Sequence, residues 1–255
     1  MKIIIVNGSP RKNGATAEIL YEMQRQLEQY SNVSVEVVHV ADLELKYCAG
    51  CGVCYKKGAC IYQDDLEKLP QKIRDADGVI LGSPTYASNV SGQMKVVIDR
   101  GHFVMEQLLY GKYAVSVVTY ENYGGKDCAK VLNRLLTYSG ARLSGAIVAQ
   151  SRLHSKMLHD ARLSGKIQKV VNRFYRDIAG KRKYLLQDMK HFIVFYFGVR
   201  RFVLLKGAQY VLTSRNFTTQ TVYHSLSPYS LINLFTAVLG ESLFISNLFF
   251  IPILE

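Results

Sequence analysis

The chain has 255 residues, enough for one large domain or for one domain of ordinary size with an appendage. Apolar residues make up 49% of it, so a sizeable core can form and a globally disordered protein is excluded. The formal charge of +12 favours anionic partners such as nucleotide cofactors, nucleic acid or an anionic membrane.

Strand-like and helix-like segments alternate over residues 1–180. The first apolar run follows Met1 without the basic segment and cleavage signal of a secretory peptide, which favours a cytoplasmic protein. Short apolar runs predict buried strands at residues 2–7, 33–40, 78–81, 113–120 and 146–150. Segments with a helical period predict helices at residues 16–30, 64–75, 92–109, 126–139 and 156–179. This alternation predicts an α/β fold, a doubly wound five-stranded parallel sheet with right-handed crossovers.

Residues 181–255 do not continue the alternation and are expected to form a separate, mostly helical extension. Its first part, 181–206, holds seven Lys or Arg residues against one acidic residue, Asp188. Its end, 231–254, is long enough to span a bilayer, but Glu241 in its middle would be costly there. We therefore expect the extension either to pack on the first domain or on a second copy, or to make a peripheral contact with an anionic membrane.

The first predicted strand is followed by a loop rich in groups that bind phosphate, GSPRKNGAT at residues 8–16. Ser9 and Thr16 offer hydroxyls, Arg11 offers a guanidinium, and Gly14 allows close backbone approach at the start of a helix. The loop matches neither the Walker A pattern nor the G-x-G-x-x-G of dinucleotide sites. It therefore indicates a phosphate site of another kind, the alternative being an ordinary strand–helix turn with a capping Thr.

Four of the five cysteines, Cys48, Cys51, Cys54 and Cys60, lie within thirteen residues in a C-x2-C-x2-C-x5-C pattern. Spacings of three can bring thiolates onto one concave side around a single inorganic centre, and neighbouring glycines let the backbone bend. Zinc sites usually use well-separated ligand pairs, which this segment lacks. Clustered cysteines in a cytosolic chain indicate metal or redox chemistry more than structural disulfides.

Three other charged or reactive groups have simpler interpretations. Asp64 and Asp65 are suited to capping the helix that follows them. Asp99 and Arg100 are expected to form an ion pair on a helix, and Cys128 is expected to be a small buried side chain.

The loop after the third strand makes a family resemblance specific. It reads SPTYASNVSGQMK from Ser83, and Val97, Ile98, Asp99 and Arg100 follow it. Together with GSPRKNGAT it resembles the NADPH-dependent FMN reductase family of flavodoxin-like proteins. The cysteine segment between the second strand and the second helix resembles that family's iron–sulfur flavoprotein branch. The resemblance covers about residues 1–180.

The resemblance implies a set of site residues. The first loop would hold the FMN phosphate through Ser9, Arg11, Lys12, Gly14, Ala15 and Thr16. The second would line the isoalloxazine and ribityl chain through Pro84, Thr85, Tyr86, Asn89, Val90 and Ser91. The third, after the fourth strand, would contribute Gly124 and Gly125. The four clustered cysteines would bind a [4Fe–4S] cluster, although many similar reductases keep such a segment without a cluster.

The resemblance implies an FMN-dependent oxidoreductase that passes electrons from NAD(P)H or ferredoxin through FMN, with or without a [4Fe–4S] cluster. No protein side chain is expected to be catalytic, because hydride and electron transfer belong to the cofactor. The expected partners are a nicotinamide nucleotide or a redox protein, a second copy of the chain, and no nucleic acid. Two alternatives stand beside this: an NAD(P)H:FMN or quinone reductase whose cysteines bind nothing, and a flavodoxin-like electron carrier without a substrate.

Overall fold

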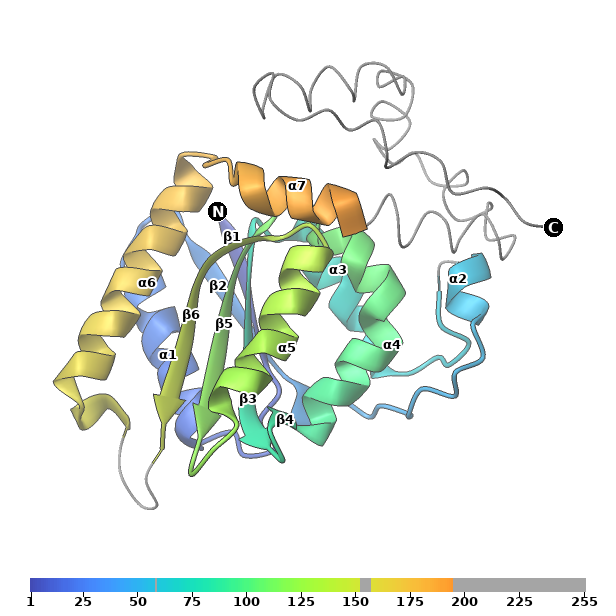
Figure 1. Cartoon of the computed structure of the whole chain (residues 1–255), viewed down its shortest axis with the longest axis horizontal. Helices are drawn as coiled ribbons and strands as arrows, with labels where there is room; N and C mark the ends of the chain where they lie inside the picture. The colour runs from blue at the N-terminus through green and yellow to red at the C-terminus, as the bar shows by residue number, and fades with distance from the viewer. Residues whose placement is uncertain (58, 152–156, 195–255) are drawn as a thin grey trace, which may run out of the picture. The chain divides into compact units, whose positions relative to one another are not determined.

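The computed structural model describes residues 1–57, 59–151 and 157–194, which form a parallel β-sheet between two layers of helices (Figure 1). The apolar segment 231–254 and the part of the extension after 194 lie outside the described residues. The last described helix belongs to the same compact unit as the sheet, Met1–Ala208.

Five parallel strands in the order β2-β1-β3-β5-β6 make up the sheet, and this confirms the predicted α/β fold. Their bounds are β1 Lys2–Asn7, β2 Ser34–His39, β3 Gly78–Tyr86, β5 Tyr113–Tyr120 and β6 Arg142–Gln150. Ile3, Ile4, Ile5 and Val6 of β1 are all buried, as expected of a central strand covered on both faces. The chain reverses its direction of travel across the sheet between β1 and β3, which is where open α/β sheets bind ligands.

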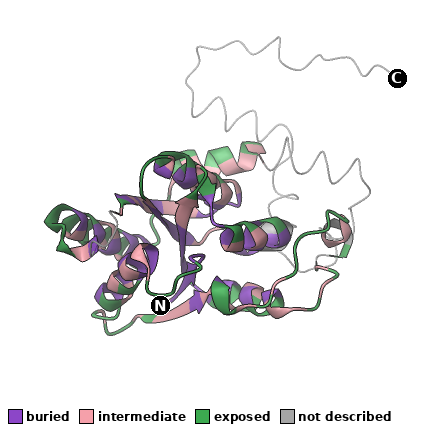
Figure 2. Ribbon diagram, turned by 90° about the horizontal axis from the view of Figure 1, so that it is seen from below, coloured by how far each residue is buried: buried purple, intermediate pink, exposed green. Residues whose placement is uncertain are grey.

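Helices cover the two faces of the sheet in separate layers. On one face lie α1 (Ala15–Leu27) and α6 (Ala161–Ala179). On the other lie α3 (Lys68–Asp75), α4 (Gly92–Leu109) and α5 (Gly125–Tyr138). Figure 2 shows the buried residues concentrated in the strands and on the inner sides of these helices. Cys128 of α5 is fully buried, as predicted.

Three local features differ from the predictions. The closing helix begins at Ala161 rather than near residue 156, because Asp160 caps it by accepting a hydrogen bond from the Arg162 amide at 2.8 Å. Asp64 does cap a helical segment, but that segment starts as a 3₁₀ turn before α3. The short strand β4 (Asn89–Val90) pairs antiparallel with the end of β3 and was not predicted.

The predicted ion pair between Asp99 and Arg100 is wrong. Consecutive residues of a helix are about 100° apart around its axis, so the two side chains point in different directions. Asp99 pairs with Lys95 one turn earlier on the exposed side of α4. Arg100 is buried and pairs with Asp64, which precedes α3.

Beyond Gly180, helix α7 (Leu185–Ile193) packs on β6 and α5 through its polar side. The Gln187 side chain accepts a hydrogen bond from the Leu143 amide at 2.7 Å and donates one to the Leu143 carbonyl at 3.2 Å. The outer side of α7 is apolar, with Leu185 and Leu186 exposed by 70% and 82%. No helix in the described part of the chain is long and apolar enough to cross a bilayer.

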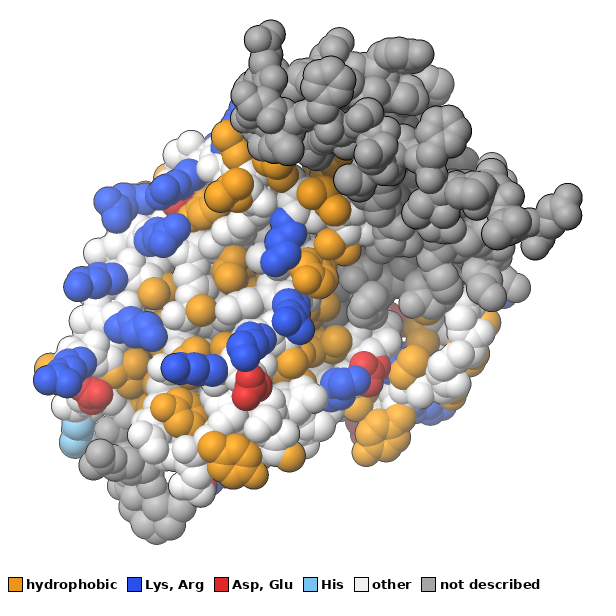
Figure 3. All heavy atoms as spheres, in the orientation of Figure 1, with side chains coloured by type: hydrophobic (Ala, Val, Ile, Leu, Met, Phe, Trp, Pro, Cys, Tyr) orange, Lys and Arg blue, Asp and Glu red, His pale blue; other side chains and the backbone are white. Residues whose placement is uncertain are grey.

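On the face of the molecule seen in Figure 3, Lys and Arg side chains outnumber Asp and Glu and are scattered among hydrophobic and other side chains. Exposed basic residues lie on the outer sides of two helices, Lys126, Lys130 and Arg134 on α5 and Arg162, Lys166 and Lys169 on α6. These exposed side chains contribute to the chain's net charge of +12.

Candidate functional site

Three loops meet at the carboxyl ends of the central strands. The first, 8–14, follows β1; the second, 87–91, contains β4 and follows β3; the third, 121–124, follows β5. In Figure 1 they lie together at the lower end of the sheet, where the strand arrows point. Parallel strands bring all their carboxyl ends to one edge, so the chain order alone assembles these loops.

The first loop presents two basic side chains and an open helix N-terminus. Arg11 and Lys12 are exposed, and Lys12 forms an ion pair with Asp42, which follows β2. Gly14 is the N-cap of α1 and provides no side-chain cap, so the first-turn N–H groups are not capped by it. A helix N-terminus with nearby cations is suited to an anion such as a phosphate.

The hydroxyls predicted to bind phosphate are engaged inside the protein. Ser9 is buried, and its Oγ donates to the Arg11 carbonyl at 3.0 Å and accepts from the Arg11 amide at 3.2 Å. The Thr16 hydroxyl is buried 2.7 Å from the Thr119 hydroxyl of β5. In this conformation both residues fix the shape of the loop, while Arg11, Lys12, Gly14 and the partly exposed Ala15 form its accessible part.

Ser91 joins the first loop to the second. Its Oγ donates to the Gly8 carbonyl at 2.5 Å and accepts from the Met94 amide at 3.2 Å, so it also caps α4. Its own amide donates to Ser83 Oγ at 2.9 Å. A Cβ on Gly8 would lie 2.7 Å from Met94 Cβ, which shows how closely β1 approaches α4 here. The two loops therefore form one rigid edge.

The second loop contains a strained turn. Ala87 and Ser88 both have positive φ, 48° and 61°, between the paired residues Tyr86 and Asn89. Side chains other than glycine rarely occupy this region, and such strain is concentrated at functional sites. Tyr86 is 47% exposed and Asn89 is exposed, so both predicted contacts are accessible, whereas Val90 is buried.

The neighbouring residues of β3 leave one buried polar atom unsatisfied. Thr85 Oγ1 is buried without a hydrogen-bond partner, although Thr85 and Pro84 are themselves partly exposed. Beneath them, Cys128 approaches the Pro84 carbonyl at 4.0 Å, and burial raises the pKa of its thiol. Cys128 is thus a packing residue under the loop, and its thiol lies against the Thr85 and Ser83 side chains, which partly offset the effect of burial on its pKa.

The third loop packs directly on the second. Gly124 has φ +79°, and a Cβ there would lie 2.5 Å from Ser88 Oγ and 2.6 Å from Ser88 Cα. Gly125 is buried against the Tyr120 ring, so of the two predicted glycines only Gly124 borders the second loop. Tyr123 is 71% exposed and was not predicted as a site residue. Its position beside the glycines, in a loop at a strand's carboxyl end, was the available signal.

The cysteine segment lies between β2 and α3 and includes the short helix α2 (Val53–Lys57). Cys48 and Cys51 are exposed, Cys54 and Cys60 are partly exposed, and no disulfide joins them. Gly50 and Gly52 have positive φ, and the Gly50 amide donates to Cys48 Sγ at 3.5 Å. Within the described residues, no three His, Cys, Asp or Glu side chains are gathered as a metal ion would require.

A buried ion pair lies where the two ends of the cysteine segment come together. Arg100 and Asp64 side chains are only 1% and 8% exposed and hydrogen-bond to each other. Burial alone would raise the pKa of the Asp64 carboxyl, but hydrogen bonds from Arg100 and from the Lys46 and Leu66 amides hold it below its usual value. Asp64 is therefore ionised at neutral pH and serves as the counter-ion of Arg100.

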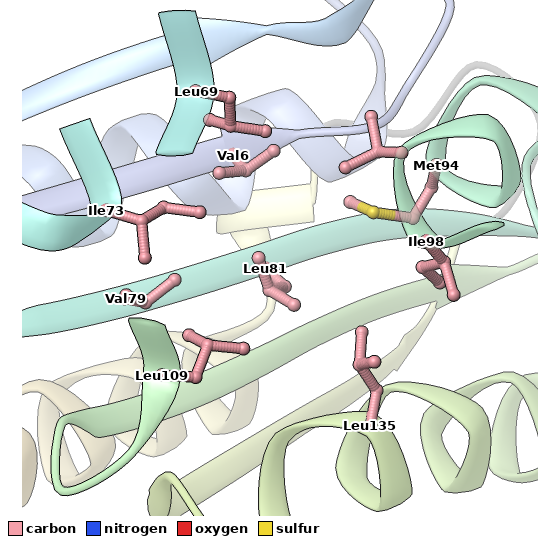
Figure 4. A pocket seen from close by; sticks show the side chains of 10 residues that line it. Val6, Leu69, Ile73, Val79, Leu81, Met94, Ile98, Leu109 and Leu135 are labelled. Atoms are coloured by element: carbon pink, nitrogen blue, oxygen red, sulfur yellow. The ribbon is translucent and has the colours of Figure 1, made fainter. Parts of the chain in front are cut away.

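A small apolar cavity lies elsewhere, in the core between α3, α4 and the sheet. Figure 4 shows the side chains that point toward it, among them Val6, Leu69, Ile73 and Met94. All of its lining residues are apolar, so it offers no group to orient a polar ligand. It is a packing defect of the core and not part of the site.

Comparison with known proteins agrees with this geometry. Residues 1–154 match the family model described as NADPH-dependent FMN reductase. An iron–sulfur flavoprotein of Clostridioides difficile is 37% identical over 184 residues, which cover 71% of this chain and 81% of that protein. An iron–sulfur flavoprotein of Archaeoglobus fulgidus is 40% identical over 141 residues, covering 53% of this chain and 62% of that protein.

Solved structures show the same fold at low sequence identity. An NADH:FMN oxidoreductase in its apo form superposes with a TM-score of 0.54 at 19% identity, covering 68% of this chain and 87% of that one. An azoreductase from Bacillus anthracis superposes with a TM-score of 0.52 at 13% identity, covering 68% of this chain and all of that one. The family match, the Clostridioides relative and the three loops agree: the chain belongs to the NADPH-dependent FMN reductase family, in its iron–sulfur flavoprotein branch.

Proposed function

We propose that the chain is an FMN-dependent oxidoreductase that draws electrons from NAD(P)H or a reduced redox protein. The observation that carries this is the meeting of three loops at the switch point, with a basic, uncapped helix N-terminus on one side and exposed tyrosines on the other. Family membership supports FMN-dependent oxidoreduction. When bound, FMN supplies the acceptance of hydride and its release as single electrons.

The residues fit FMN by position and chemistry. Arg11 and the α1 N-terminus would hold the phosphate through charge-assisted hydrogen bonds. Tyr86 and Tyr123 would flank the flat ring, because both are exposed beside the meeting point of the second and third loops. Asn89 and Gly124 border the same surface. Ser9, Thr16 and Ser91 would act by fixing the loops.

The four cysteines would hold a [4Fe–4S] cluster. Three observations support this assignment. Four thiols lie in one segment, and Gly50 and Gly52 in that segment have a left-handed conformation. The Gly50 amide also donates a hydrogen bond to Cys48 Sγ. The curated relatives carry the iron–sulfur name, which supports the same assignment. The alternative is a reductase without a cluster, and it is favoured by the fact that the described cysteines are not gathered around one point.

Other partners follow from the remaining surfaces. Related flavin sites lie near subunit interfaces, so we propose a homo-oligomer.

The exposed apolar side of α7, preceded by exposed Lys181, Arg182 and Lys183, supports peripheral contact with an anionic membrane. Sedimentation with anionic but not neutral vesicles, reversed by salt, would support that contact, and no sedimentation would refute it.

The decisive experiment is anaerobic purification of the full chain followed by quantification of FMN, iron and acid-labile sulfide. One FMN with about four irons and four sulfides per chain supports the complete proposal. FMN without iron leaves the plain reductase, and no FMN refutes both. Bleaching of the flavin absorbance by NADPH or NADH then separates a reductase from an electron carrier that nicotinamide nucleotides do not reduce.

A further inference from the structure

Arg100 occupies an unusual position, because it is a buried cation on the helix that begins at the second loop. Its Nη1 donates to the Lys46 carbonyl at 3.1 Å and to the Asp64 carboxylate. Its Nη2 donates to Cys60 Sγ at 3.3 Å and to the Tyr62 carbonyl at 3.5 Å. The guanidinium thus contacts the chain just before the first clustered cysteine and again at and after the last one.

The neighbouring contacts strengthen this attachment. The Lys46 amide donates to Asp64 at 3.0 Å, so the two ends of the cysteine segment are bonded to each other as well as to Arg100. The Arg100 guanidinium also lies over the Tyr62 ring, 5.2 Å from its centroid. A planar fork with five donors can satisfy several acceptors at fixed angles, which a lysine cannot do.

The same helix is anchored to the first loop at its other end. Ser91 caps α4 and donates to the Gly8 carbonyl, and Arg100 lies farther along α4. A continuous series of hydrogen bonds and helix backbone therefore runs from the first loop to Cys60. One donor of the series is unused: Arg100 Nε is buried and has no hydrogen-bond partner. An additional acceptor at this position would satisfy it.

We propose that Arg100 is a positioning residue that fixes the cysteine segment to α4, and through α4 to the first loop, and that it tunes an iron–sulfur centre through Cys60. The tuning part rests on the proposed function, whereas the attachment does not. Hydrogen bonds to the sulfur ligands of such a centre are among the factors that set its reduction potential. A positive charge beside Cys60 stabilises the more negative, reduced centre, so Arg100 raises that potential.

The test compares the full-length wild type with Arg100→Lys, Arg100→Gln and the control Asp99→Asn. Lysine keeps a charge beside Asp64, which protects against loss of folding, but it lacks the fork. Asp99 is the adjacent residue of α4 and pairs only with Lys95 at the surface in the described contacts. Amide hydrogen exchange of peptides covering 44–66 reports the attachment, and redox titration reports the potentials of the iron–sulfur centre and of FMN.

We expect exchange in 44–66 to be about tenfold faster in both Arg100 variants, with β1 peptides unchanged. The reduction potential of the iron–sulfur centre should fall in both Arg100 variants, most in Arg100→Gln, while the FMN potential should not change. In Asp99→Asn both potentials and the exchange rates should equal those of the wild type. Unchanged exchange would overturn the attachment, and faster exchange with an unchanged potential would overturn the tuning. Wild type without iron would instead refute the cluster proposed above, and exchange alone would then decide the role of Arg100.

Discussion

Replacement of Gly124 by alanine tests whether the third loop belongs to the site. Gly124 has φ +79°, and a Cβ there would overlap both Oγ and Cα of Ser88 in the strained turn of the second loop. Gly111 is a matched control, because it has φ +74° but no atom within 4 Å of the added Cβ. Both substitutions impose the same backbone strain, and only Gly124→Ala also forces two loops apart.

The magnitudes follow from these two contributions. A left-handed conformation costs a residue other than glycine roughly 1–2 kcal/mol, so Gly111→Ala should lower the free energy of unfolding by about that much. Overpacking adds roughly 1–3 kcal/mol, so Gly124→Ala should lower it by about 2–5 kcal/mol. FMN binding requires the displaced turn to return, so the overpacking contribution should weaken FMN binding by roughly 5- to 150-fold in Gly124→Ala alone.

Urea unfolding of the apoproteins, followed by circular dichroism, measures the free energy of unfolding. Titration of flavin fluorescence measures the affinity for FMN. The comparison is between the two variants, so the backbone contribution cancels. Equal unfolding free energies in the two variants would show that the third loop does not press on Ser88. Equal FMN affinities would remove the third loop from the flavin site, whatever the stabilities.

Three further predictions concern other parts of the chain. Arg11→Ala should weaken FMN by about 1.5–3 kcal/mol, the contribution of a charge-assisted hydrogen bond, whereas the surface control Lys130→Ala should not; equal affinities in a flavin titration would refute this. Cys51→Ala should lose iron and sulfide but keep FMN, because the flavin loops are separate from the cysteine segment; iron retained at wild-type stoichiometry would contradict it. Burial lowers the pKa of His191, so its contribution to stability is complete above an unfolded pKa near 6.5 and is lost as the pH falls below it. Urea midpoints at pH 7.5 and 5.5 should therefore differ more in wild type than in His191→Gln, and an equal difference would show that His191 is not responsible.

The strands and the place of the site could be predicted because each depends on local information. Runs such as Ile3–Val6 are apolar throughout, and a loop that follows a parallel strand must lie at its carboxyl end. Which hydroxyls of the first loop form hydrogen bonds within the protein could not be predicted in this way. Ser9 and Thr16 carry suitable hydroxyls, but the partner of Thr16 is Thr119, more than a hundred residues away.

Arg100 illustrates the same limit more sharply. Sequence neighbourhood pointed to Asp99, whereas burial of the guanidinium required a partner on the inner side of α4, and the fold supplies Asp64. By contrast, the sequence contains the local signal for the true start of α6, because Asp160 is a favourable N-cap directly before Ala161, although the prediction placed the start near residue 156. Long-range pairs of charged side chains, unlike caps, leave no periodic trace in a single sequence.

The contact between Gln187 and Leu143 has a consequence for how the edge of the sheet is protected against the addition of a strand from another molecule. Strand β6 is the last in the sheet order, so the outer side of its backbone is a template on which a strand from another molecule could add. A glutamine amide has the same donor and acceptor as a peptide group, and here it occupies both positions at Leu143. Helix α7 thus blocks the position at which a sixth parallel strand could pair with β6. A change that separates α7 from β6 would expose an edge prone to aggregation.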